Sequence, residues 1–108
     1  MSDPRQLQHL TALAAASALV LRLDPAPGDF HVSCHPWSPT EASITMNAHR
    51  DLPTVAAWAA ELGTELISRP HGDSHICWSF TTTVAGVAVE GYTLLSLDEN
   101  RQQAGGVE

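Results

Sequence analysis

The sequence contains no lysine, and its five basic residues are arginines that stand far apart along the chain. Twelve acidic residues outnumber them, which gives a formal net charge of −7 at pH 7. Proteins that bind nucleic acid neutralise its phosphates with clustered Lys or Arg side chains. The composition therefore argues against direct binding to nucleic acid, and it suits a basic protein partner better.

Long apolar runs and abundant cysteine are also missing. The longest apolar stretch lies between Ala12 and Leu21, whereas roughly twenty residues are needed to cross a bilayer. No cationic segment followed by a cleavage site opens the sequence, so a secretory signal is not predicted. The two cysteines, Cys34 and Cys77, are too few for a disulfide scaffold and are typical of reduced thiols. We therefore expect a cytoplasmic protein without a membrane span.

Signatures of catalysis are lacking as well. No serine stands in a nucleophile elbow, and no glycine-rich loop precedes a predicted helix. The run Asp73-Ser74-His75 contains the residue types of a hydrolase triad, but adjacent residues on a strand point to opposite faces. The sequence therefore predicts a protein without catalytic activity.

Apolar periodicity predicts two helices. The first runs from about Pro4 to Leu21, with Asp3 as its cap, and the second follows Asp51 and stops at Gly63. Helical spacing places Leu7, Leu10, Ala14, Ala18 and Leu21 on one stripe of the first helix, and Val55, Trp58, Ala59 and Leu62 on one stripe of the second.

Alternation of apolar and polar residues predicts five strands, at residues 29–35, 42–49, 64–69, 74–84 and 87–97. The resulting order is α-β-β-α-β-β-β. It predicts an α+β fold of two layers, with a five-stranded, mostly antiparallel sheet and both helices on one face. Residues 1–97 form the predicted domain, and residues 98–108 are expected to be a disordered tail.

Histidines are frequent on the polar face of the predicted sheet. His31 and His35 lie roughly 13 Å apart on one strand, too far to share a zinc ion. A zinc site would need ligands from several strands, and the candidates are His35, His49, His75 and Cys77. The alternative is that these side chains are solvated or hydrogen-bonded on a wet sheet face, which antiparallel sheets commonly have.

Two aromatic residues are predicted to contact a partner. Trp37 stands in a proline-rich turn, and Tyr92 belongs to the last strand, which is apolar on both faces in places. Trp58 and Trp78 fall at apolar positions and are predicted in the core. These features favour a protein-interaction module, which either forms a homodimer or binds another protein. The alternative is a domain that binds a metal or small ligand through its histidine-rich face.

A short part of the chain carries a resemblance to known proteins. It comprises the Leu52-Pro53-Thr54-Val55-Ala56-Ala57-Trp58-Ala59 stretch, Glu61-Leu62-Gly63, and Thr83-Val84-Ala85-Gly86-Val87-Ala88-Val89. These segments resemble a group of small uncharacterised actinobacterial proteins associated with phages and integrative elements. The resemblance covers under half of the chain. It implies a shared fold and a mobile-element setting, and it implies no activity or site residues.

Overall fold

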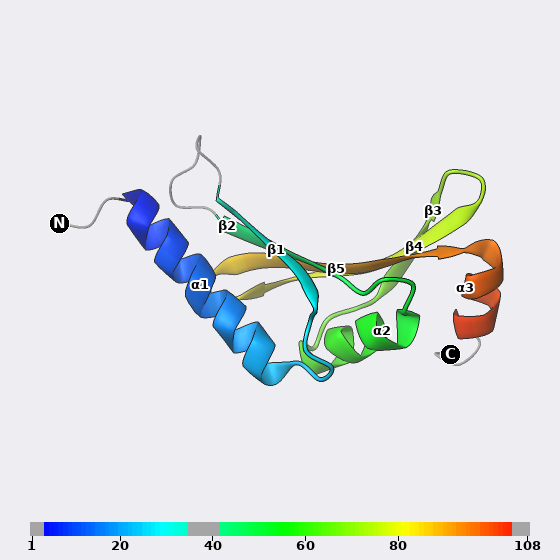
Figure 1. The fold of residues 1–108 in the computed structure, drawn as a ribbon, viewed down its shortest axis with the longest axis horizontal. Coiled ribbons are helices and arrows are strands. Elements are labelled where there is room, and N and C mark those ends of the chain that lie inside the picture. Colours follow the sequence, from blue (N-terminus) through cyan, green and yellow to red (C-terminus); the bar gives the residue numbers. More distant parts are fainter. Residues whose placement is uncertain (1–3, 35–41, 105–108) are drawn as a thin grey trace.

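A computed structural model describes residues 4–34 and 42–104 of the chain. They form three helices and a five-stranded mixed sheet, which confirms the predicted α+β class (Figure 1). The helices are α1 (Pro4–Arg22), α2 (Leu52–Glu61) and α3 (Leu97–Ala104). The strands are β1 (Asp29–Cys34), β2 (Ala42–Asn47), β3 (Ile67–His71), β4 (His75–Val84) and β5 (Val87–Ser96).

The strands lie in the order β1-β2-β5-β4-β3. β2 and β5 are parallel, whereas the other neighbouring strands are antiparallel. β4 and β5 are joined by Ala85 and Gly86, which have φ angles of 52° and 80°. Positive φ at both central residues is the geometry of the two-residue turn whose twist matches a hairpin. In this strand order β5, the last of the described strands, lies in the middle of the sheet.

One hydrophobic core joins α1 and α2 to the sheet. Its large side chains include Leu19 of α1, Trp58 of α2 and Phe80 of β4, each at most 2% exposed. The indole Nε1 of Trp58 donates a hydrogen bond to the carbonyl oxygen of Pro25 at 2.7 Å. This bond ties α2 to the segment that follows α1, and it satisfies the one polar atom of the buried indole.

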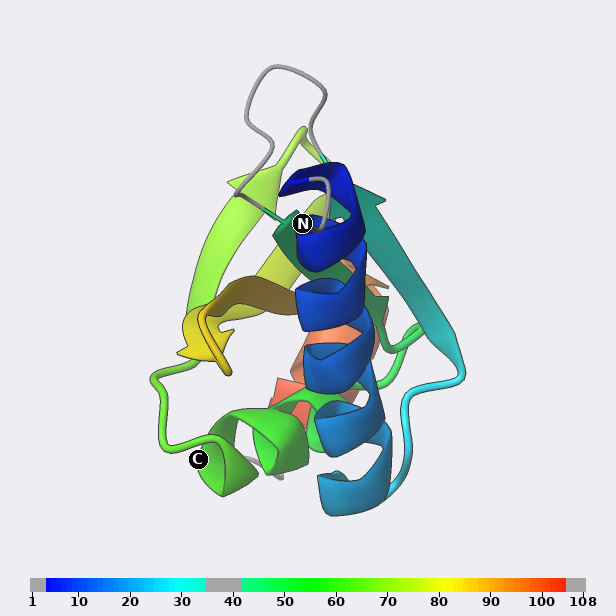
Figure 2. The same cartoon turned by 90° about the vertical axis from the view of Figure 1, so that its left-hand side faces the viewer.

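The apolar stripe predicted on α1 is not the side of the helix that packs into the core. The side that packs into the core carries Ala12, Ala15, Ala16 and Leu19. Leu7, Leu10 and Leu21, which belong to the predicted stripe, lie on the exposed side. Between Ala12 and Leu21 only Ser17 is polar, so no single apolar stripe in this part of the sequence identifies the buried face. Figure 2 shows α1 nearest to the viewer, with the strands behind it. Within the described residues, no helix is long and apolar enough to span a membrane.

The start of α2 agrees with the prediction. Asp51 is the cap, and its Oδ1 accepts a hydrogen bond from the backbone N–H of Thr54 at 3.1 Å. Such a bond satisfies one of the amides that a helix leaves unpaired in its first turn. Gly63 follows the helix with a φ of 66°, a left-handed conformation that glycine adopts without a steric penalty.

The predicted tail is helical over residues 97–104, where α3 replaces the disorder expected from residue 98 onward. Ser96 and Glu99 form a reciprocal capping box at its start. The Ser96 N–H donates to Glu99 Oε1 at 2.9 Å, and the Glu99 N–H donates to Ser96 Oγ at 3.1 Å. Asn100 Oδ1 accepts a hydrogen bond from Trp78 Nε1 at 2.7 Å, which holds α3 against β4. Residues 105–108 lie outside the described part of the chain.

Candidate functional site

The side of the sheet opposite the core carries a mostly polar surface, which we call the open face. The register places Thr81, Glu90 and Thr45 side by side on β4, β5 and β2. Ser79 and Tyr92 form the next row. Side chains alternate between the two faces of a strand, so these residues point away from the buried Ile44, Val89 and Phe80.

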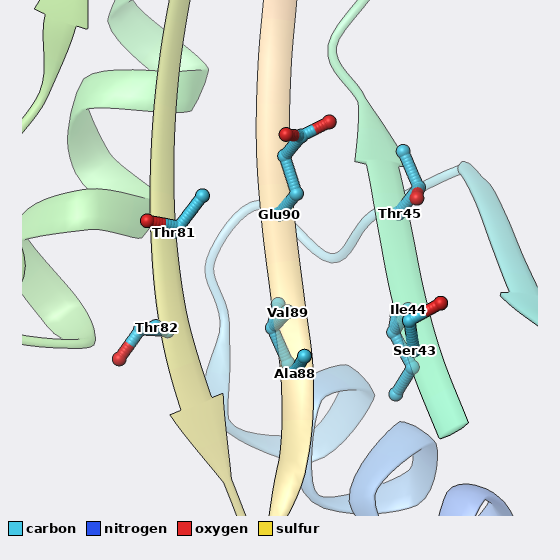
Figure 3. A pocket seen from close by; sticks show the side chains of 8 residues that line it. All are labelled: Ser43, Ile44, Thr45, Thr81, Thr82, Ala88, Val89 and Glu90. Atoms are coloured by element: carbon cyan, nitrogen blue, oxygen red, sulfur yellow. The ribbon is translucent and has the colours of Figure 1, made fainter. Parts of the chain in front are cut away.

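A hollow of about 310 Å³ opens around Ala88 on this face. Ala88 has a short side chain, while its neighbours carry hydroxyl groups and one carboxylate. Figure 3 shows Thr81 on one side of β5 and Ser43 and Thr45 on the other, with Glu90 between them. The lining residues are Ser43, Ile44, Thr45, Thr81, Thr82, Ala88, Val89 and Glu90.

A second hollow of about 310 Å³ shares Glu90 with the first. Burial raises the pKa of the Cys77 thiol above its ordinary value, the Glu90 carboxylate raises it further, and the Arg69 guanidinium lowers it. A raised pKa keeps the thiol protonated at neutral pH, so Cys77 is not activated as a nucleophile. The lining residues are Arg69, Pro70, His71, Cys77, Ser79, Glu90 and Tyr92.

The predicted metal ligands are only partly brought together. His75 and Cys77 share the open face of β4, whereas His49 lies in an exposed turn after β2. β5 separates β2 from β4, which places the two strands nearly 10 Å apart. Across residues 4–34 and 42–104, no three His, Cys, Asp or Glu side chains form a group that could hold a metal ion. His35 lies outside the described residues.

A histidine pair at the end of the β3–β4 hairpin was not predicted. His71 stands directly opposite His75, because β3 continues past Pro70 instead of ending at residue 69. Ser74 lies in the intervening turn, and its Oγ is 2.8 Å from His75 Nδ1. The strand geometry that argued against this contact does not apply, because Ser74 is a turn residue. The Ser74 side chain is exposed at the tip of the hairpin and lines neither hollow.

The predicted partner residues have different outcomes. Tyr92 is half-buried in the second hollow on the open face. Trp37 lies outside the described residues. The last strand, which suggested an uncovered apolar surface, buries Val87, Val89 and Leu95 in the protein interior. These three apolar residues of β5 are therefore not available to a partner.

Five of the large hydrophobic side chains that are exposed to solvent lie on α1. Leu10 is 61% exposed, Leu13 is 59% exposed and Leu21 is 88% exposed. Leu7 is 52% exposed and Val20 is 45% exposed. We call the surface formed by these five residues the outer face of α1. Its sequence signal is the second half of the helix, where Ser17 is the one polar residue between Ala12 and Leu21 and apolar residues on every side usually require cover on every side.

Comparison of the chain with protein-family models, curated proteins and solved structures gives no match. The resemblance to actinobacterial phage-associated proteins therefore stays a prediction. The candidate sites rest on the chain's own geometry, in which two surfaces stand out. These are the outer face of α1 and the open face of the sheet.

Proposed function

We propose that the chain is a cytoplasmic protein-interaction module without catalytic activity, and that the outer face of α1 contacts a second copy of the chain. The observation that carries this proposal is the exposure of Leu10, Leu13 and Leu21 along one helix. Contiguous exposed apolar patches with a polar border are typical of protein contact sites. Here Thr11 and Arg22 provide polar neighbours along the helix.

Burial of these side chains would provide the driving force for association. Removing one exposed leucine from water contributes on the order of 1.5 kcal/mol. In a symmetric dimer every residue of the patch is buried twice, once in each copy. Three leucines from each copy therefore contribute roughly 9 kcal/mol, which is comparable to the roughly 4–15 kcal/mol cost of lost rotational and translational freedom.

The charge distribution supports a second copy as the occupant. The chain carries a net charge of −7, so two copies repel each other over most of their surface. No Asp, Glu, Lys or Arg stands between Arg5 and Arg22 in the sequence. The outer face of α1 is therefore a surface on which two identical acidic chains meet without bringing formal charges together.

The oligomeric state tests the proposal directly. Sedimentation equilibrium of the full chain, over a hundredfold range of concentration, should give a mass of twice 11.5 kDa. The double variant Leu10→Glu, Leu21→Glu should sediment as a monomer with an unchanged far-ultraviolet circular dichroism spectrum. Leu97→Glu is the matched control, because Leu97 is 44% exposed on α3 and its replacement should leave the dimer intact. A wild-type chain that stays monomeric throughout would overturn the proposal.

A second candidate function is binding of a small cationic ligand to the open face. Two hollows share the Glu90 carboxylate. Thr45 and Thr81 stand on either side of Glu90, and Ser43 also lines the first hollow. A carboxylate with nearby hydroxyl acceptors suits an ammonium group. Titration with spermidine, followed by calorimetry, should give heat that Glu90→Gln abolishes. Equal heats for both proteins would remove this candidate.

The mobile-element setting is a separate part of the proposal. It is supported by the resemblance at residues 52–89 and not by the geometry of either surface. The sequence of the genome around the gene tests it, because phage or integration genes should flank it.

A further inference from the structure

The exposed side of α1 has the spacing of a coiled-coil seam. Leu7, Leu10, Ala14, Ser17 and Leu21 follow one another at intervals of three, four, three and four residues, the a and d positions of a heptad. All five are exposed. Leu13 and Val20 flank the seam on one side, and Thr11 and Ala18 flank it on the other. A seam of this kind packs against another helix at a crossing angle near 20°.

We infer that the second copy contributes its own α1, and that the two helices pack antiparallel with Ala14 and Ser17 at the crossing. This inference rests on the proposed function, because it specifies the contact through which the dimer forms. It places Leu10 of one copy against Leu21 of the other. Leu10 and Leu21 are equally distant in sequence from the midpoint between Ala14 and Ser17, so the contact occurs twice about one twofold axis.

The size of the side chains sets the position of the crossing. Two helices approach most closely where their side chains are smallest, and they diverge on either side of that point. Ala14, Ser17 and Ala18 are the small exposed residues in the middle of α1, with leucines before and after them. Small residues at the crossing and large residues beyond it fill a space that widens away from the centre.

The surroundings of the two ends of α1 favour antiparallel packing of the two helices. Its C-terminal end lies beside α2, because Arg22 Nη2 donates to the Glu61 carbonyl oxygen at 2.7 Å (Figure 1). A parallel pair would bring both α2 helices together, with Asp24 and Glu61 of each copy at the same end. An antiparallel pair keeps these carboxylates at opposite ends and also aligns the two helix dipoles favourably.

Cysteine cross-linking tests the direction of the helices. The single variants Leu10→Cys and Leu21→Cys are made in a chain whose native cysteines are replaced by Cys34→Ser and Cys77→Ser. Antiparallel packing places two Leu10 positions about 16 Å apart along the helix axis, so neither single variant should form a covalent dimer under mild oxidation. An equal mixture of the two variants should form the heterologous covalent dimer at several times the background yield. A Gln102→Cys variant, mixed with Leu21→Cys, measures that background, because Gln102 is exposed on α3, at the opposite end of the molecule from α1 (Figure 1).

Each outcome of this experiment has one meaning. Covalent dimers in each single variant at full yield would show parallel helices and overturn the inference. A noncovalent dimer that shows no cross-link in the mixture would also overturn it, while the proposed self-association would stand. A chain that sediments as a monomer before oxidation would overturn both.

Discussion

The side-chain oxygen of Gln103 accepts a hydrogen bond from the backbone N–H of Leu52 at 2.8 Å. The same side chain donates from Nε2 to the carbonyl oxygen of Arg50 at 3.0 Å. Leu52 is the first residue of α2, where backbone amides have no partner within the helix. The last helix of the chain therefore completes the cap of a helix about fifty residues earlier.

Replacement of Gln103 by Ala should destabilise the protein through the loss of both hydrogen bonds. We expect the free energy of unfolding to fall by about 1–2 kcal/mol, measured by urea denaturation. Gln102→Ala is the control, because Gln102 is an exposed neighbour on the same helix and its change should cost less than about 0.5 kcal/mol. Equal losses for the two variants would contradict the capping role.

Gly91→Ala should destabilise the sheet. Gly91 lies opposite Phe80 in the β4–β5 pair, and a methyl group at Gly91 would come within 2.2 Å of Phe80 Cε2. The buried Phe80 ring must move to admit it, so we expect a loss of about 2 kcal/mol or more in the free energy of unfolding. Thermal unfolding of the variant measures this loss.

The matched control for that variant is Gly28→Ala. No atom lies within 4 Å of a methyl group placed there, and the residue does not adopt positive φ. We expect its unfolding free energy to change by less than about 0.5 kcal/mol. If Gly91→Ala is as stable as Gly28→Ala, the position of the Phe80 ring does not require a glycine at position 91.

The docking of α3 should weaken in acid. The backbone N–H of Ser96 lowers the pKa of the Glu99 carboxyl, and this effect outweighs partial desolvation, which raises it. The Ser96 hydroxyl and the charges of Arg50 and His75 lower it as well. A carboxyl whose pKa is lower in the folded state contributes its full stabilisation of the fold above its unfolded pKa, which is about 4.3. This stabilisation is lost as the pH falls through the folded-state pKa.

The indole N–H resonance of Trp78 reports this change, because Trp78 is hydrogen-bonded to Asn100 of α3. Between pH 6 and pH 2 it should shift toward the position found in a chain truncated after Leu97. In Glu99→Gln the amide oxygen still accepts from Ser96 without titrating, so the acid-dependent part of the shift should vanish. An identical pH profile in Glu99→Gln would contradict the prediction.

The pKa of Cys77 should move in opposite directions in two variants. Glu90→Gln removes a negative charge that disfavours the thiolate, and should therefore lower the pKa. Arg69→Gln removes a positive charge that favours the thiolate, and should raise it. The pH dependence of alkylation by iodoacetamide, measured in a Cys34→Ser background, gives both values. Shifts of the same sign would contradict the assigned electrostatic contacts.

Local patterns in the sequence predict much of the fold. The cap at Asp51, the turn at Ala85-Gly86 and the alternation along β1, β2, β4 and β5 are each set by neighbouring residues, and the structure agrees with them. The parallel pairing of β2 with β5 depends on residues far apart in the sequence. No local pattern encodes that pairing. Alternation along each strand predicts which residues lie on the open face, but it does not predict which strands are neighbours, and the two hollows depend on those neighbours.

The two errors in the helices have different physical causes. The orientation of α1 could not be read from periodicity, because Leu10 and Leu21 on one side are as apolar as Ala15 and Leu19 on the other. α3 has no buried residue of its own, so a search for apolar stripes misses it. The Ser96-Leu97-Asp98-Glu99 run is its signal, since Ser followed three residues later by Glu predicts a helix start.

The position of β5 has a consequence for the order in which the chain acquires structure. β5 is the last of the five described strands to be synthesised, yet it is the strand that joins the β1–β2 hairpin to the β4–β3 hairpin within the described sheet. Until it emerges from the ribosome, β2 and β4 each expose an unpaired backbone edge. We therefore expect β1–β2 and β3–β4 to join into a single cooperative unit only in a late step, when β5 pairs with both β2 and β4.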